Sequence, residues 1–150
     1  MKILAAIDGS DSSLRALRYV MGHAEFFGAS PEVILVNVHL PIPSVRAKSI
    51  LGSDVIDQYY RDESEAAVAP ARDVLKGSSC KVTERHLVGD VAKEIVASAS
   101  ALACDMIVMG ARGASELRSA MMGSVSNEVL HSSTVPVTIV RMPEQAPSWR

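Results

Sequence analysis

Short runs rich in β-branched residues alternate along this 150-residue chain with longer segments in which apolar residues recur every three or four positions. The short runs predict five strands, at residues 2–8, 32–40, 81–88, 105–110 and 135–141. Strands that alternate with helices are typical of βαβ units, which build a parallel sheet. The pattern therefore predicts one α/β domain with a single doubly wound parallel sheet of five strands and helices on both faces.

The segments between the strands predict four helices, because each carries an apolar stripe of helical period. We expect the first helix to begin at Ser10 or Asp11 and to end at Gly28. The second covers about residues 54–76 and is expected to be interrupted or kinked near Pro70.

The rest of the chain is assigned from its capping and turn residues. Two shorter helices are expected, one after Asp90 and one after Gly123. Residues 40–52, which include two prolines, predict a long irregular loop. Residues 143–150 are expected to form a loose tail behind a domain that spans residues 1–142.

Two strands are expected at the edges of the sheet. The third strand, at residues 81–88, alternates apolar and polar residues, whereas the first, second and fourth are nearly continuous in apolar residues. The final strand, from Val135 to Arg141, is expected at the opposite edge, where its apolar run is an aggregation hazard if left unpaired. Pairing with the same strand of a second copy removes the hazard and predicts a homodimer. Cover by the chain's own tail is the alternative.

Charge and composition exclude several classes of partner. The chain has 15 Lys and Arg against 17 Asp and Glu, a net charge of −2, so we expect no nucleic-acid partner. No apolar run approaches the ~20 residues of a membrane span, and the first one ends at Asp8, too early for a signal peptide. Cys80 and Cys104 form no CxxC motif, which favours a reducing compartment. We therefore expect a soluble, cytoplasmic protein.

Two segments that follow predicted strands carry the residues expected to bind a ligand, since ligands of doubly wound sheets bind beyond the carboxyl ends of the strands. After the first strand, Asp8 opens a polar turn that is either an anion site or an ordinary capped turn. After the fourth, Gly110-x-x-Gly113 is followed by nine residues and then by Gly123-Ser124. Glycines let the backbone approach a phosphate, and a helix start supplies N–H donors. The two glycine clusters therefore predict a polyphosphate site, although the P-loop motif GxxxxGK[ST] is missing.

The glycine pattern, together with ILAAIDGS near the N-terminus and VPVTIVR near the C-terminus, resembles the universal stress protein family over residues 2–142. The glycine motif is similar to that of the family's ATP-binding branch. The resemblance implies a Rossmann-like sheet of order 3-2-1-4-5, of the adenine nucleotide alpha hydrolase type. It implies that Ala6, Asp8 and Val38 contact the adenine and ribose. The residues that it places around the ribose and phosphates are Gly110, Arg112, Gly113, Gly123, Ser124, Val125 and Ser126.

The same resemblance implies a regulatory or protective protein that binds ATP, or ADP or AMP, together with Mg²⁺ or Mn²⁺. No catalytic residue can be named, because no group that positions a nucleophile is evident, so hydrolysis is expected to be slow or absent. The histidines have no metal-ligand spacing, and only His39 is expected near the pocket. Two alternatives stay open: an enzyme that hydrolyses ATP slowly or phosphorylates itself on Ser124 or Ser126, and a dimeric interaction module with an empty site.

Overall fold

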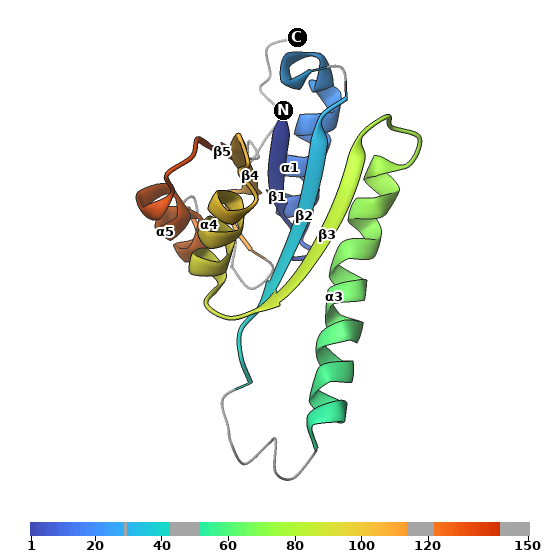
Figure 1. The fold of residues 1–150 in the computed structure, drawn as a ribbon, viewed down its shortest axis with the longest axis vertical. Helices are drawn as coiled ribbons and strands as arrows, with labels where there is room; N and C mark the ends of the chain where they lie inside the picture. The colour runs from blue at the N-terminus through green and yellow to red at the C-terminus, as the bar shows by residue number, and fades with distance from the viewer. Residues whose placement is uncertain (29, 43–51, 114–121, 142–150) are drawn as a thin grey trace, which may run out of the picture.

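The computed structural model describes residues 1–28, 30–42, 52–113 and 122–141. Its strands form one five-stranded parallel sheet of order β3-β2-β1-β4-β5, which confirms the predicted fold class (Figure 1). In chain order the elements are β1 (Lys2–Ala6), α1 (Asp11–Gly22), the 3₁₀ turn η1 (Ala24–Phe27), β2 (Glu32–His39), α3 (Ser53–Leu75), β3 (Lys81–Val88), α4 (Val91–Ala101), β4 (Met106–Gly110), α5 (Ser124–Ser132) and β5 (Val137–Val140).

Helices cover both faces of the sheet. Leu17 of α1 and Val68 of α3 pack on one face of β1 and β2, and both are fully buried. Ile95 of α4 and Val129 of α5 pack on the other face, and Figure 1 shows these two helices on the side of the sheet opposite α3. Successive side chains of a strand point to opposite faces, so a strand covered on both sides is apolar at nearly every position. This explains the continuous apolar runs of β1, β2 and β4.

The outer strands lie where their patterns predicted. β3 forms one edge of the sheet and β5 forms the other. Five of the eight β3 side chains are exposed, whereas all five of β4 are buried. β5 is shorter than predicted: it begins at Val137 because Pro136 has no N–H to donate to the neighbouring strand, although the Pro136 carbonyl still accepts the N–H of Ile107 at 2.9 Å.

The first helix is shorter than predicted. Ser10 caps α1 through its Oγ, which accepts the N–H of Ser13 at 3.1 Å. The helix ends at Gly22 rather than at Gly28, and the apolar stripe that continued beyond it belongs to η1. Gly28 instead ends that 3₁₀ turn with φ at +92°, a conformation that favours glycine.

The second long helix is not interrupted at Pro70. α3 runs from Ser53 to Leu75 with the proline inside it. A proline in a helix removes one backbone hydrogen bond, and burial of the flanking Val68 and Ala71 against the sheet offsets that loss.

The remaining elements follow their capping signals. Asp90 caps α4, its Oδ1 accepting the N–H of Lys93 at 3.1 Å, and Gly123 directly precedes α5. Most of the predicted loop 40–52, the segment between the two glycine clusters and the tail 143–150 lie outside the described residues. Within the described residues, no helix has both the length and the apolar character needed to cross a membrane.

Candidate functional site

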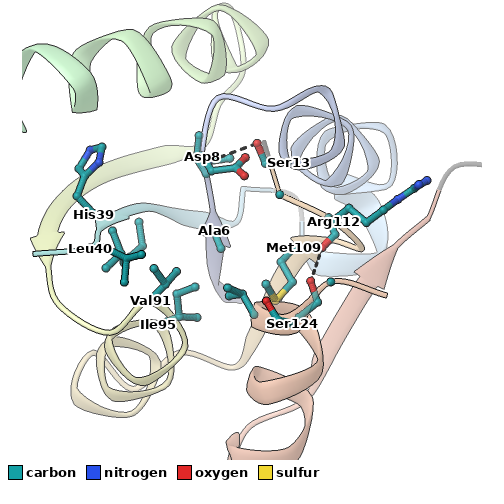
Figure 2. A pocket seen from close by; sticks show the side chains of 18 residues that line it. Ala6, Asp8, Ser13, His39, Leu40, Val91, Ile95, Met109, Arg112 and Ser124 are labelled. Atoms are coloured by element: carbon teal, nitrogen blue, oxygen red, sulfur yellow. Dashed lines mark hydrogen bonds between the residues drawn. The ribbon is translucent and has the colours of Figure 1, made fainter. Parts of the chain in front are cut away.

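A cavity of about 430 Å³ lies beyond the carboxyl ends of β1, β2 and β4 (Figure 2). This is where the order of the strands reverses, the position at which doubly wound sheets bind ligands. Its volume falls within the range of small-molecule sites. All the residues that sequence reasoning nominated line it: Ala6, Asp8, Val38, Gly110, Arg112, Gly113, Gly123, Ser124, Val125 and Ser126.

The turn after β1 holds Asp8 at the edge of the cavity. Asp8 Oδ1 accepts hydrogen bonds from the N–H of Ser10 at 3.0 Å and from its hydroxyl at 2.6 Å. The N–H of Asp8 donates in turn to Ser13 Oγ at 3.4 Å, the contact drawn in Figure 2. These bonds close a compact turn of the kind that Asp favours, so the Asp8 carboxylate is fixed relative to the sheet.

The buried amide of Asn37 supports the same turn from inside and was missed by sequence reasoning. Asn37 is 2% exposed, and its Nδ2 donates to the carbonyl of Ile7 at 2.8 Å. The N–H of Ile7 donates to Val36 at 2.9 Å, so both backbone groups of the residue before Asp8 are held by β2. An Asn in an otherwise apolar strand was the available signal.

A backbone contact that sequence reasoning missed requires a glycine at residue 110. A Cβ at this position would lie 2.7 Å from the carbonyl carbon of Ser12, a separation that real Cβ atoms do not show. The close approach between β4 and the first turn of α1 therefore requires a glycine at this position. Gly110 still lines the cavity, and its carbonyl accepts the Ser126 hydroxyl at 2.9 Å.

The second glycine cluster also differs from the prediction in detail. The N–H of Gly123 donates to the carbonyl of Ala111 at 2.7 Å, so this amide is used inside the protein. The N–H groups of Val125 and Ser126, in the first turn of α5, can instead donate to a ligand, because the first turn of any helix lacks carbonyl partners within the helix. Gly113 faces Asp8: a Cβ there would lie 3.1 Å from Asp8 Oδ2.

The polar side chains near this end have distinct roles. Ser126 is 3% exposed, and its hydroxyl is committed to Gly110. Ser124 is exposed at the start of α5. Arg112 lines the cavity, but Figure 2 shows its guanidinium extending away from the cavity, so the predicted phosphate contact requires a different rotamer.

The other end of the cavity is apolar. Ala6 and Val38 line it together with three side chains that were not nominated as ligand contacts: Leu40, Val91 and Ile95. In Figure 2 Leu40, Val91 and Ile95 lie together on the side away from Arg112 and Ser124. Val91 and Ile95 belong to the first turns of α4, and their apolar character alone does not distinguish pocket lining from core. Only the packing of α4 over β1 and β2 brings them to Ala6.

His39 lies beside the cavity, as expected. Its Nε2 is 3.0 Å from Ser64 Oγ of α3. Burial lowers the pKa of His39, Glu63 opposes this by raising it, and His86 lowers it further. The imidazole is therefore held in its neutral form near neutral pH, so His39 provides a hydrogen-bonding group rather than a positive charge at this wall.

Within the described residues, no group of three or more His, Cys, Asp or Glu side chains is placed to hold a metal ion. The polar end of the cavity offers the Asp8 carboxylate as an oxygen ligand. Mg²⁺ is commonly bound through one or two carboxylates plus the phosphates of a nucleotide. The donor set thus fits a divalent ion that enters with a phosphorylated ligand.

A five-stranded parallel sheet with a cavity beyond the carboxyl ends of its strands defines the Rossmann-like class of α/β proteins. The model of the "Universal stress protein family" matches residues 1–141. The chain belongs to this family. Universal stress protein MJ0531 of Methanocaldococcus jannaschii is 30% identical over 96% of this chain and 84% of its own length. Universal stress protein YxiE of Bacillus subtilis is 32% identical over 93% of this chain and 98% of its own length.

Solved structures agree with this assignment. Universal stress protein UspA from Lactobacillus plantarum superposes with a TM-score of 0.75 at 19% identity, covering 94% of this chain and 97% of its own. A universal stress protein crystallised in complex with cAMP has a TM-score of 0.56 at 26% identity, covering 93% and 96% of the two chains. The first likeness concerns the fold alone.

Proposed function

We propose that the cavity binds an adenine nucleotide and that the chain is a nucleotide-dependent regulatory or protective protein of the stress response. The observation that carries the proposal is the division of one cavity into an apolar end, at Ala6, Val38 and Leu40, and an end lined by the first turn of α5 and the Asp8 turn. A purine is a flat, largely apolar group, and a phosphate is favoured at a helix N-terminus. The relative in complex with cAMP supports this choice of ligand.

The finer proposal is ATP, or ADP or AMP in its place, with Mg²⁺ or Mn²⁺ carried by the phosphates. The adenine would lie against Ala6 and Val38, with its ribose near Asp8. The phosphates would lie between Gly113 and the amides at the start of α5. When bound, the divalent ion would neutralise phosphate charge, and the Asp8 carboxylate is the acidic group in the cavity lining that would help to hold it.

The site is better suited to binding a nucleotide than to hydrolysing it rapidly or transferring its phosphate to a serine. Ser126 is buried and already donates its hydroxyl to Gly110, which makes it a poor acceptor for a phosphoryl group. The exposed Ser124 is the remaining candidate for self-phosphorylation. Incubation with ATP and Mg²⁺ followed by mass spectrometry separates the classes: a binding protein leaves both serines and the nucleotide unchanged, whereas phosphate at Ser124 or released ADP indicates an enzyme.

We also propose a homodimer joined through β5. The alternative edge, β3, is less suited to such pairing. When two copies of β3 pair antiparallel about a two-fold axis, one residue lies opposite its own copy. In the two registers of greatest overlap that residue is Glu84 or Arg85, so like charges would face each other. β5 (Val137–Val140) carries no charge, so the same pairing there meets no such repulsion.

A cytoplasmic location and the absence of a nucleic-acid partner remain parts of the proposal. Cys80 and Cys104 are both free thiols, which fits a reducing compartment. The net charge of −2 gives no basis for attraction to a polyanionic nucleic acid.

Calorimetric titration with ATP and with AMP tests the nucleotide site. In Gly113→Val the new side chain projects between residue 113 and the Asp8 carboxylate, so both nucleotides should bind at least about tenfold more weakly, or about 1.4 kcal/mol. Gly22→Val is the matched control, because a Cβ at Gly22 meets nothing within 4 Å and that residue lies outside the cavity lining. Absence of binding to the unaltered protein at millimolar nucleotide would contradict the proposal and favour an interaction module with an empty site.

A further inference from the structure

Side chains of α3 hold the chain where it leaves β2. The Tyr60 hydroxyl accepts the N–H of Ile42 at 2.8 Å and lies 3.5 Å from the carbonyl of Leu40, to which it donates. One turn further along the helix, Ser64 Oγ contacts His39 Nε2 at 3.0 Å. Residues four apart share one face of a helix, so Tyr60 and Ser64 form a single surface against which residues 39–42 are held.

This attachment bears directly on the cavity. Leu40 lines its apolar end although its side chain is 68% exposed. An exposed leucine has no surrounding core to fix its place, so its position depends on its backbone. The Leu40 carbonyl and the Ile42 N–H, the two groups that contact Tyr60, belong to the two peptide units that flank Pro41.

The ring of Tyr60 strengthens the same arrangement. Its centroid is 5.9 Å from that of His39, with the two planes inclined at 39°, a separation at which aromatic rings attract. The backbone of His39 is held independently, since its carbonyl accepts the N–H of Gly89 at 2.9 Å. The end of β2 is thus held by the loop after β3, and the backbone of the next residue, Leu40, is held by Tyr60.

We propose that Tyr60 is a positioning residue for the ligand site: its hydroxyl fixes the backbone around Leu40, and thereby sets how well the apolar end of the cavity closes on an adenine ring. Tyr60 itself is not among the residues that line the cavity. The inference rests on the proposed adenine-nucleotide function and adds to it a residue on α3 that acts through Leu40.

Tyr60→Phe tests the proposal by removing the hydroxyl alone and keeping the ring. We expect both ATP and AMP to bind about three- to tenfold more weakly, by the same factor, because the phosphates bind at the other end of the cavity. Tyr59→Phe is the matched control: Tyr59 is the preceding residue of α3, is 49% exposed and does not line the cavity.

A double-mutant cycle with Leu40→Ala distinguishes positioning from a general structural role. If Tyr60 acts by placing Leu40, then Tyr60→Phe should weaken nucleotide binding in the native background and have no further effect once Leu40 is alanine. An equal loss in both backgrounds, or unchanged binding in Tyr60→Phe, would overturn the inference while leaving the nucleotide site intact. Absence of nucleotide binding to the unaltered protein would instead overturn the proposed function, and this inference with it.

Discussion

Gly110 and Ser12 are packed so closely that the end of β4 and the first turn of α1 leave no room for a methyl group between them. A Cβ on residue 110 would lie 2.7 Å from the Ser12 carbonyl carbon and 2.8 Å from its oxygen. Both partners are backbone atoms, which cannot rotate away as a flexible side chain would. This contact sets the distance between the Asp8 turn and the glycine segment after β4, and hence the width of the cavity between them.

Gly110→Ala should therefore lower the free energy of unfolding by about 1–3 kcal/mol, the usual cost of forcing extra volume into a packed site. Urea unfolding measures the change. Gly22→Ala is its control, because residue 22 is helical, has space for a Cβ, and should leave stability unchanged or raise it by about 0.5–1 kcal/mol. Equal stability of the two variants would show that the backbone at residue 110 relaxes freely.

Stability should depend on pH through His39. Its folded-state pKa is lowered by burial from the ordinary value of about 6.5, so the unfolded chain binds the proton more readily than the folded protein does. The contribution of His39 is complete above pH 6.5 and is lost as the pH falls through the lower folded-state pKa. The free energy of unfolding should thus decrease between pH 7.5 and pH 5.

His39→Gln should flatten that decrease, and chemical denaturation at a series of pH values measures it. The exposed His131, at the end of α5, provides the control substitution His131→Gln. A pH profile that keeps its slope in His39→Gln would mean that another group is responsible.

Arg72 should contribute more to stability than Lys76, the ion-paired cation directly after α3. Its guanidinium contacts Glu84 on β3 at 2.6 Å and Glu65 on its own helix at 2.5 Å, and it lowers the pKa of both carboxyl groups. Arg72→Met keeps the apolar stem and should cost about 0.5–1 kcal/mol at low salt, mainly through the partly buried Glu84, with a smaller loss at 1 M salt.

Lys76→Met serves as the comparison for Arg72. Lys76, directly after α3, pairs with Asp73 of that helix, and both side chains are largely exposed at 76% and 66%. Such a pair contributes little, so no measurable loss is expected in urea unfolding. If Lys76→Met lowers the free energy of unfolding as much as Arg72→Met does, the ion pair between α3 and β3 is not the reason for the effect of Arg72.

The two edge strands give a matched test of the proposed dimer. Thr138 lies in β5 and Thr83 in β3, and both are half-buried. Thr138→Asp brings two negative charges to the proposed two-fold interface, so sedimentation should show the 16.0 kDa monomer in place of a dimer. Thr83→Asp should leave the dimer unaffected. Dissociation by Thr83→Asp alone would place the interface at β3.

Much of the architecture follows from local pattern. The β-branched runs placed all five strands to within about two residues, because strand burial on two faces demands apolar residues at nearly every position. Capping residues such as Ser10 and Asp90 marked two helix starts, since their side chains satisfy N–H groups only a few residues away. The expected interruption at Pro70 and the expected helix end at Gly28 were wrong, because packing against the sheet keeps α3 continuous and because a 3₁₀ turn follows α1.

The candidate site likewise combines features that local sequence predicts with features that depend on the fold. Local sequence identifies the residues at the ends of β1, β2 and β4, and shows that these ends carry an acid, glycines and a helix start, because these signals lie in neighbouring positions of the chain. The contacts of Gly110 with Ser12, of Val91 and Ile95 with the cavity beside Ala6, and of Tyr60 with Ile42 are visible in the folded structure alone. Those contacts join segments far apart in the chain, and they depend on how helices pack over the sheet, which no local period encodes.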